Sequence, residues 1–211
     1  MTVRVPQQPR AIRTRAKLLA AAQREFSERG HGGATARSIA QRAGVATGSF
    51  YQYFRDKDAA LRELGAARLA QISREVLGHL EPQGADGSSE RGQVRGRLRA
   101  LVETLMAYHR EDRGLHAVLT ERRAHDPELD RLTTEGERAL VGALAATLAR
   151  WGHSGDHEAT AFVLFGMVEA AVHAHCLGHP LVSDERLIDA LLDALVHVAL
   201  PRPFDEAQGE A

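Results

Sequence analysis

The chain has little cysteine, few aromatic residues and no long uncharged apolar run. Its 211 residues include one cysteine, Cys176, and only 5% are aromatic. A single cysteine excludes a disulfide framework and a four-cysteine zinc site, and it fits a reducing compartment. No uncharged apolar run reaches the roughly 18 residues of a membrane span, and the N-terminus lacks the apolar segment of a signal peptide. These absences favour a cytoplasmic protein without a membrane partner.

Catalytic motifs are also missing. The sequence contains no Gly-x-Ser-x-Gly, no phosphate-binding loop and no His-Glu-x-x-His. We therefore expect no enzyme activity, no catalytic residues and no cofactor. The composition, 44% apolar and 26% charged, instead predicts a folded protein of one large or two small domains.

Charge is divided unevenly along the chain. Residues 1–60 carry 11 basic and 4 acidic side chains, whereas the rest carries 16 basic and 24 acidic ones. A basic segment on an acidic body favours contact between that segment and a polyanion such as DNA. The alternative is a solvated charge pattern without such a partner.

Apolar residues recur at helical spacing, and no segment alternates as a half-buried strand would. We expect an all-α fold of about nine helices. A stretch rich in Pro, Gly and Ser over residues 82–90 predicts a loop between helices. The expected helices cover residues 10–29, 36–43, 47–54, 57–80, 91–110, 115–124, 127–151, 156–177 and 184–200.

Two short helices joined by a turn that contains a glycine form a helix-turn-helix candidate in the basic segment. Gly30 ends the preceding helix, where a positive φ suits glycine, and the side chain of Thr35 caps the first short helix. The outward face of the second short helix is small and polar, which suits the major groove of DNA. Inward residues of the pair are Ile39, Ala40, Ala43, Val45, Phe50 and Phe54.

A long gapped pattern over about 50 of the 211 residues resembles the N-terminal domain of TetR-type transcriptional regulators. The remainder resembles the family only in length and in helical content. The pattern reads Phe26-x-x-x-Gly30, then Thr35-x-x-x-Ile39-Ala40-x-x-Ala43-Gly44-Val45-x-x-Gly48-x-Phe50-Tyr51-x-Tyr53-Phe54-x-x-Lys57-x-x-Leu61.

Two positions depart from the family's pattern. Ala46 stands where the family often has a serine that caps the recognition helix, so Thr47 is the candidate cap one residue later. His31 stands where the family often has an aromatic residue, which predicts a weaker anchor between the first two helices.

The resemblance implies which residues bind DNA. Thr35 would direct a helix N-terminus at a phosphate, and Lys57 would bind a phosphate as a point charge. Tyr51 and Tyr53 would place hydroxyls on phosphates; the alternative is that they are rim aromatics of the small core. The implied set is Thr35, Arg37, Thr47, Gly48, Ser49, Tyr51, Gln52, Tyr53 and Lys57.

The resemblance also implies the domain organisation and the activity. It implies a basic arm over residues 1–9, a DNA-binding domain over 10–60, an effector-binding and dimerisation domain over 61–202, and a tail over 203–211. Such a protein is a homodimeric repressor that binds a pseudo-palindromic operator in double-stranded DNA and is released by a small-molecule effector. An effector-free DNA-binding protein is an alternative.

In such a protein the helices after residue 90 enclose the effector pocket. Glu169 lies in an apolar stretch, where a carboxylate needs a polar partner or a ligand group. The candidate pocket residues are Tyr108, His109, His116, Arg122, Phe162, Phe165, Glu169 and His173.

The 11 histidines raise the alternative of a metal- or redox-responsive regulator. Gly178 and Pro180 interrupt the helix that would align the nearest His/Cys group, and Cys176 has no second cysteine to resolve its oxidation. We therefore predict no metal site. The groups considered are His175, Cys176 and His179, and His153, Asp156, His157 and Glu158.

The last two helices predict dimerisation, because together they carry more apolar surface than one body can cover. Small residues at positions 159, 166 and 170 would permit close approach in a two-fold, four-helix interface. The alternative is that both helices are core of one chain. Predicted interface residues are Phe162, Leu187, Ile188, Leu191, Leu192, Leu195 and Val196.

Overall fold

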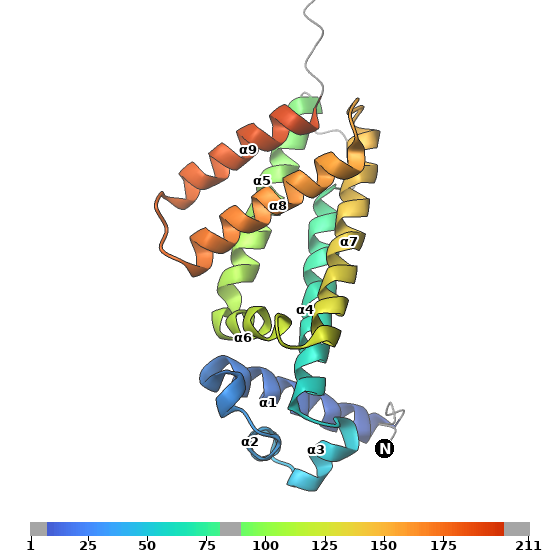
Figure 1. The fold of residues 1–211 in the computed structure, drawn as a ribbon, viewed down its shortest axis with the longest axis vertical. Coiled ribbons are helices and arrows are strands. Elements are labelled where there is room, and N and C mark those ends of the chain that lie inside the picture. Colours follow the sequence, from blue (N-terminus) through green and yellow to red (C-terminus); the bar gives the residue numbers. More distant parts are fainter. Residues whose placement is uncertain (1–7, 81–89, 201–211) are drawn as a thin grey trace, which may run out of the picture. The chain divides into compact units, whose positions relative to one another are not determined.

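A computed structural model describes residues 8–80 and 90–200. Over these residues the chain forms nine α-helices and no strand, which confirms the all-α prediction (Figure 1). The predicted tail, most of the predicted loop and the first seven residues of the predicted arm lie outside the described residues. The helices are α1 Pro9–Gly33, α2 Ala36–Arg42, α3 Thr47–Tyr53, α4 Lys57–Leu80, α5 Glu90–Glu111, α6 Arg113–Arg123, α7 Pro127–Arg150, α8 His157–Leu177 and α9 Asp184–Ala199.

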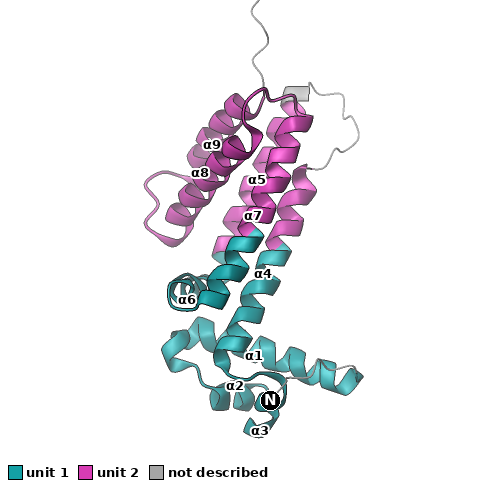
Figure 2. Cartoon of the chain, turned by 45° about the vertical axis from the view of Figure 1, so that its right-hand side comes forward, with its two compact units in different colours: residues 1–71, 110–136 teal, residues 72–109, 137–211 magenta. Residues whose placement is uncertain are grey.

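The chain divides into two compact units (Figure 2). Unit 1 comprises residues 1–71 and 110–136, and unit 2 comprises residues 72–109 and 137–211. Helices α4 and α7 contribute residues to both units. Unit 1 therefore contains α6 in addition to the helix-turn-helix segment that the sequence delimits at residue 60.

The core of unit 1 forms where α1, α2 and α3 meet α4. Phe26, Ile39, Phe50 and Leu61 are each fully buried, and Leu115 of α6 packs on the same cluster. Gly30 has a φ of 66° and interrupts the helical geometry near the end of α1, as predicted for glycine at that position.

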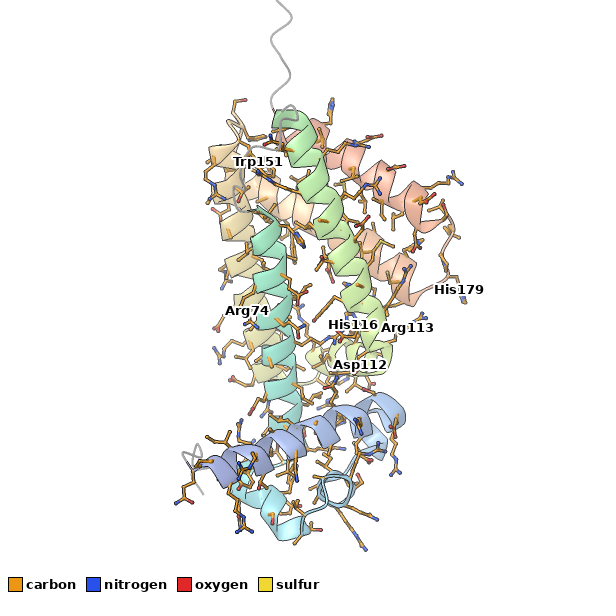
Figure 3. The ribbon with its side chains drawn as sticks, turned by 180° about the vertical axis from the view of Figure 1, so that it is seen from behind. Arg74, Asp112, Arg113, His116, Trp151 and His179 are labelled. Carbon is orange, nitrogen blue, oxygen red and sulfur yellow. The ribbon has the colours of Figure 1, made fainter. Side chains whose placement is uncertain are left out.

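Helix α6 docks on α1 through polar contacts within unit 1. Asp112, at the junction of α5 and α6 (Figure 3), accepts hydrogen bonds from Gln23 at 2.9 Å and from the Ser27 hydroxyl at 2.7 Å. It also caps α6 by accepting from the backbone N–H of Leu115. Gly114 permits the close approach, because a Cβ there would lie 2.3 Å from the Ser27 carbonyl oxygen.

In unit 2, α9 packs against α8. Its apolar stripe is buried, and the ion pairs Arg95–Asp193 at 2.7 Å and Arg99–Asp189 at 2.6 Å join α5 to α9. Burial of this stripe supplies a large share of the apolar surface that stabilises the unit. The buried α9 residues are Ile188, Leu191, Leu192, Leu195, Val196 and Ala199.

Candidate nucleic-acid interface

The outward face of α3 is small and polar. Phe50 points into the core, whereas Thr47, Gly48 and Gln52 are exposed and Ser49 is half-buried. A Cβ built on Gly48 would meet no atom within 4 Å, so the backbone itself is open at this point. A helix with this surface can bring its backbone and short side chains close to base edges in a major groove.

The caps of α2 and α3 differ. Thr35 caps α2 in a capping box: its hydroxyl accepts from the backbone N–H of Ser38, and the Ser38 hydroxyl lies 3.0 Å from the backbone nitrogen of Thr35. At α3 the N-cap is Ala46, which provides no side-chain hydrogen bond. Thr47 is the first residue of α3, so it does not replace the missing cap as the sequence suggested.

The two predicted tyrosines have different surroundings. Tyr51 is 55% exposed, and its ring packs edge-on against Phe50 with the ring centroids 5.5 Å apart. Tyr53 is half-buried against the core of unit 1. The exposed hydroxyl-bearing end of Tyr51 fits contact with DNA, whereas Tyr53 also has the position of a rim aromatic.

Lys57 has a structural role that the sequence did not indicate. Its ammonium donates to the carbonyl oxygens of His31 at 2.6 Å and Ala34 at 3.0 Å, so it fixes the start of α4 to the connector between α1 and α2. An ammonium has three donors, so one N–H remains beyond these two bonds.

His31 anchors the same connector. Its ring stacks on Phe26 with the centroids 6.2 Å apart and the planes at 4°, and its Nε2 lies 2.6 Å from Asp58. The imidazole therefore both stacks on Phe26 and pairs with a carboxylate, and a weaker hydrophobic anchor at this position stays a prediction.

The basic side chains of α2 divide into a paired and an exposed one. Arg42 binds Glu25 at 2.6 Å and also pairs with Glu28, and Glu25 is only 2% exposed. The hydrogen bond from Ser38, opposed by burial and helped by Arg42, holds the pKa of Glu25 below its ordinary value. Arg37 is exposed and forms no ion pair with any residue that the structure describes, so its charge faces solvent.

Comparison with known proteins identifies this arrangement. The family model described as bacterial regulatory proteins, tetR family, matches residues 18–64, and a tetracyclin repressor-like C-terminal domain model matches residues 95–198. The HTH-type transcriptional regulators BetI of Burkholderia thailandensis and Burkholderia lata are each 32% identical over 143 residues, which cover 64% of this chain and 68% of theirs. The chain belongs to the TetR family of transcriptional regulators.

Solved structures show the same fold. A putative TetR-family transcriptional regulator from Mesorhizobium loti has a TM-score of 0.73 at 22% identity, covering 90% of this chain and 98% of its own. The fatty acid degradation regulator FadR from Bacillus halodurans has a TM-score of 0.68 at 20% identity, covering 91% and 97%. Membership of the TetR family makes the chain a DNA-binding transcriptional regulator and not an enzyme.

The predicted pocket residues of this TetR-family chain fall in both units. Tyr108, His109, Glu169 and His173 gather in unit 2, where the His109 ring lies edge-on to those of Tyr108 and His173 at 5.6 Å and 5.9 Å. In unit 1, the Arg122 guanidinium lies 3.8 Å from the Asp58 carboxylate, and His116 belongs to α6 of the same unit. Phe165 is half-buried.

The predicted dimer residues differ in their exposure. On α9, five of these residues are at most 6% exposed and face the core of unit 2, and Leu187 is half-buried. The five are Ile188, Leu191, Leu192, Leu195 and Val196. They are covered within one chain and offer little surface to a second copy. Phe162 is the most exposed of the predicted interface residues, at 66%.

The exposed face of α8 is apolar instead. Phe162 and Val163 are more than 60% exposed, and the small residues Ala159, Gly166 and Ala170 continue the same face at spacings of three or four. Among the described helices, α8 is long and apolar enough to cross a membrane, with 33% of its most apolar window buried. Such a helix is weak evidence of a span, because a core helix of a soluble protein has the same composition.

The sequence-predicted metal alternatives are not assembled. His175 pairs with Asp184 at 2.8 Å, and the Cys176 sulfur faces the Met106 carbonyl oxygen at 3.8 Å. His179 is exposed on the loop between α8 and α9 (Figure 3). None of these three, nor His153 or His157, belongs to a group of three ligand atoms within the described part of the chain.

Proposed function

We propose that this regulator is a repressor that binds a pseudo-palindromic operator as a homodimer and is released by a small-molecule effector. The α2–α3 surface carries the proposal: a helix-turn-helix with a buried inner face presents an outer face of short polar groups, an exposed phenol and an exposed arginine. As a bacterial DNA-binding protein, it would act in the cytoplasm.

The geometry supports distinct roles for the exposed residues. Arg37 has an unpaired, rigid set of donors, which suits a guanine edge or a phosphate. Tyr51 and Gln52 lie on the outward face of α3, next to the side-chain-free surface at Gly48. We assign contacts with DNA bases or with the DNA backbone to Arg37, Tyr51 and Gln52. We assign a contact with a DNA phosphate to the third N–H of the Lys57 ammonium.

The exposed face of α8 supports dimerisation. An uncharged stripe with a phenylalanine and a valine at its centre is costly to leave in water, and its small residues let a second helix approach closely. Pairing α8 with α8 of a second copy would bury it in a two-fold interface. The two helix-turn-helix segments of the dimer would then bind two half-sites whose centres are about one turn of DNA, or a multiple of it, apart.

The polar cluster of unit 2 is the candidate effector site. An effector can weaken operator binding only if it binds one conformation of the dimer more tightly than the other. Helix α4 contributes residues to both units and is the candidate lever between them. Coupling of this kind is reciprocal, so operator DNA should weaken effector affinity by the same factor.

The test starts from operators selected from a randomised duplex library by the full-length protein. Arg37→Ala and Tyr51→Ala should each weaken binding of the selected duplex by about 5- to 150-fold, the loss of one base contact, and relax selectivity at one position. Lys57→Ala should weaken binding of all sequences alike and lower the salt slope by about one unit. Fluorescence anisotropy at several salt concentrations measures both effects.

The matched control is Arg138→Ala, which removes an exposed arginine from α7 in unit 2 and should leave DNA affinity unchanged. Circular dichroism checks that each variant remains helical, which matters most for Lys57 because of its carbonyl contacts. Unchanged affinity in all three variants of unit 1 would contradict the assigned interface. Selection of no preferred sequence would favour the effector-free DNA-binding alternative.

A further inference from the structure

Exposed basic side chains form a stripe along one face of α1. At about 100° per residue, they fall within an arc of about 60° around the helix axis. With a rise of about 1.5 Å per residue, the stripe is about 21 Å long. The residues of this basic stripe are Arg10, Arg13, Lys17 and Arg24.

The carboxylates of the surrounding segment are engaged elsewhere. Each Asp and Glu between residues 8 and 71 already has a basic partner in unit 1, so none of them is paired with the basic stripe. On α1 itself, Glu25 is buried and Glu28 is half exposed, and both bind Arg42 of α2. The remaining pairs are Asp56–Arg55, Asp58–His31 and Glu63–Arg15.

The basic stripe differs from the other cations of the same segment. Arg62 pairs with Asp126, and the Lys57 ammonium donates to two backbone carbonyls. No member of the basic stripe forms an ion pair with a residue that the structure describes. Four unpaired charges on one helix face create a positive local potential that attracts a polyanion.

The basic stripe borders the helix-turn-helix. Glu28 follows Lys17 by eleven residues, which is about three helical turns, so both lie on the same side of α1. The Glu28 carboxylate pairs with Arg42 at the end of α2. The stripe therefore runs along the side of α1 that meets α2, and α3 belongs to the same unit (Figure 1).

We propose that the basic stripe of α1 binds the phosphate backbone of duplex DNA that flanks the bases contacted by α3. The inference rests on the proposed function, because it extends the same DNA site. Guanidinium and ammonium groups bind phosphate oxygens without reading the bases. A stripe of about 21 Å matches about six phosphates of one strand, at about 3.4 Å of helix axis per phosphate. The stripe then adds affinity and salt dependence but no sequence preference.

The test uses the full-length protein and two duplexes that contain the same selected operator. The short duplex ends at the selected bases, and the long duplex carries about ten further base pairs, one turn of DNA, of unselected sequence at each end. Fluorescence anisotropy at several salt concentrations gives the affinity and the salt slope for each duplex. The parent protein should bind the long duplex about tenfold more tightly and with a steeper salt slope.

The double variant Arg13→Gln/Lys17→Gln removes two charges from the basic stripe and keeps residues that favour a helix. It should lose most of the affinity gained from the flanking DNA. Its salt slope on the long duplex should fall by about two units per chain, since each phosphate contact contributes about 0.9 unit. Its affinity for the short duplex and its preference among operator sequences should stay as in the parent.

The matched control is Arg74→Gln/Arg138→Gln, which removes the same net charge from two exposed arginines of unit 2 (Figure 3). It should retain the full gain from the flanking DNA. Circular dichroism checks that both double variants remain helical.

Three results would overturn the DNA contact of the basic stripe. Equal affinity of the parent protein for the two duplexes would show that flanking DNA is not bound. An equal loss in the stripe variant and in the control would reduce the effect to net charge. A stripe variant that keeps its affinity for the long duplex but no longer binds phosphatidylglycerol vesicles would assign the stripe to a membrane surface.

Arg37→Ala separates this inference from the proposed function. It should lower the preference for the operator over a scrambled duplex, while the gain from flanking DNA persists. If the library yields no preferred sequence, the proposed operator is lost, but length-dependent binding of unselected duplexes that the stripe variant loses would still support the stripe. Operator binding without any length dependence would overturn the stripe alone.

Discussion

The carboxylates that pair with other groups are more buried in unit 1 than on the α5–α9 surface of unit 2. In unit 1, Asp126 is 4% exposed and accepts from the Arg62 guanidinium at 2.9 Å and from the N–H of Leu129. Asp112 likewise accepts from two side chains and one backbone N–H. In unit 2, the carboxylates of Asp189 and Asp193, which pair with Arg99 and Arg95 on α5, are 56% and 74% exposed.

The exposed helix faces of the two units differ in polarity. The outward face of α3 is polar and stable in water, whereas the outward face of α8 is apolar. Unit 1 therefore has a polar surface at α3 that is available to DNA. Unit 2 has a feature that a partner would complete, namely the apolar face of α8.

The largest expected effect is at the apolar face of unit 2. Val163→Glu should give monomers, because it places a charge in the surface where α8 pairs with α8 of the second copy. Operator affinity should then fall more than 100-fold, because the two helix-turn-helix segments no longer bind the operator as one dimer. Light scattering and anisotropy measure the two effects. The helical fold should survive, because Val163 is 62% exposed.

Leu181→Glu is the control for this variant, since that leucine is 94% exposed on the α8–α9 loop and the change should leave the dimer intact. Leu191→Glu is unsuitable, because it would bury a charge in the core of unit 2 and unfold it. A Val163→Glu protein that stays dimeric would remove α8 from the interface.

The next effect tests the close packing of unit 1. Gly114→Val should lower the free energy of unfolding by about 3 kcal/mol, because its side chain would overlap the Ser27 backbone, which cannot move without shifting α1. Urea unfolding followed by circular dichroism measures the change. Gly142→Ala, on α7 with open space around the Cβ, should instead stabilise the protein by about 0.5–1 kcal/mol. Equal effects would show that Gly114 is not a packing position.

A smaller effect concerns acid stability. Burial raises the pKa of Asp112, but hydrogen bonds from Gln23, from the N–H of Leu115 and from Ser27 outweigh it and hold the pKa below its ordinary value of 3.8. The unfolded chain therefore binds a proton more readily than the folded chain, so stability is full above about pH 4 and falls as the pH drops through the lowered value.

Asp112→Asn removes this group from the titration. The free energy of unfolding should then decline less steeply with falling pH below about pH 4 than it does in the parent protein. Urea unfolding over a series of acidic buffers measures the slope. An unchanged slope would mean that Asp112 has the same pKa in both states.

The smallest effect distinguishes the two caps of the helix-turn-helix. Ala46→Ser should stabilise the protein by about 0.5–1 kcal/mol, because Ala46 already has the extended backbone of an N-cap and lacks only the accepting side chain. Thr35→Ala should have the opposite sign and a similar size, since it removes an existing cap. Thermal unfolding measures both, and a destabilising Ala46→Ser would contradict the cap assignment.

The sequence by itself determined the helices and the DNA-reading segment. Local signals set these features: glycine accepts the positive φ at residue 30, threonine caps α2, and apolar spacing places Ile39 and Phe50 inside. The nine predicted helices begin and end within a few residues of those in the structure.

Only the tertiary structure decided which surfaces the long helices leave exposed. The stripe of α9 and the face of α8 are both apolar, and the sequence predicted an interface built from both helices. Packing buries the α9 stripe and leaves Phe162 and Val163 of α8 exposed. Packing also makes the Lys57 ammonium a hydrogen-bond donor to backbone carbonyls, and it brings the His109 ring to the Glu169 carboxylate across 60 residues of chain. Periodicity identifies an apolar face, but the element that covers it is chosen by contacts between residues distant in sequence, which no local pattern contains.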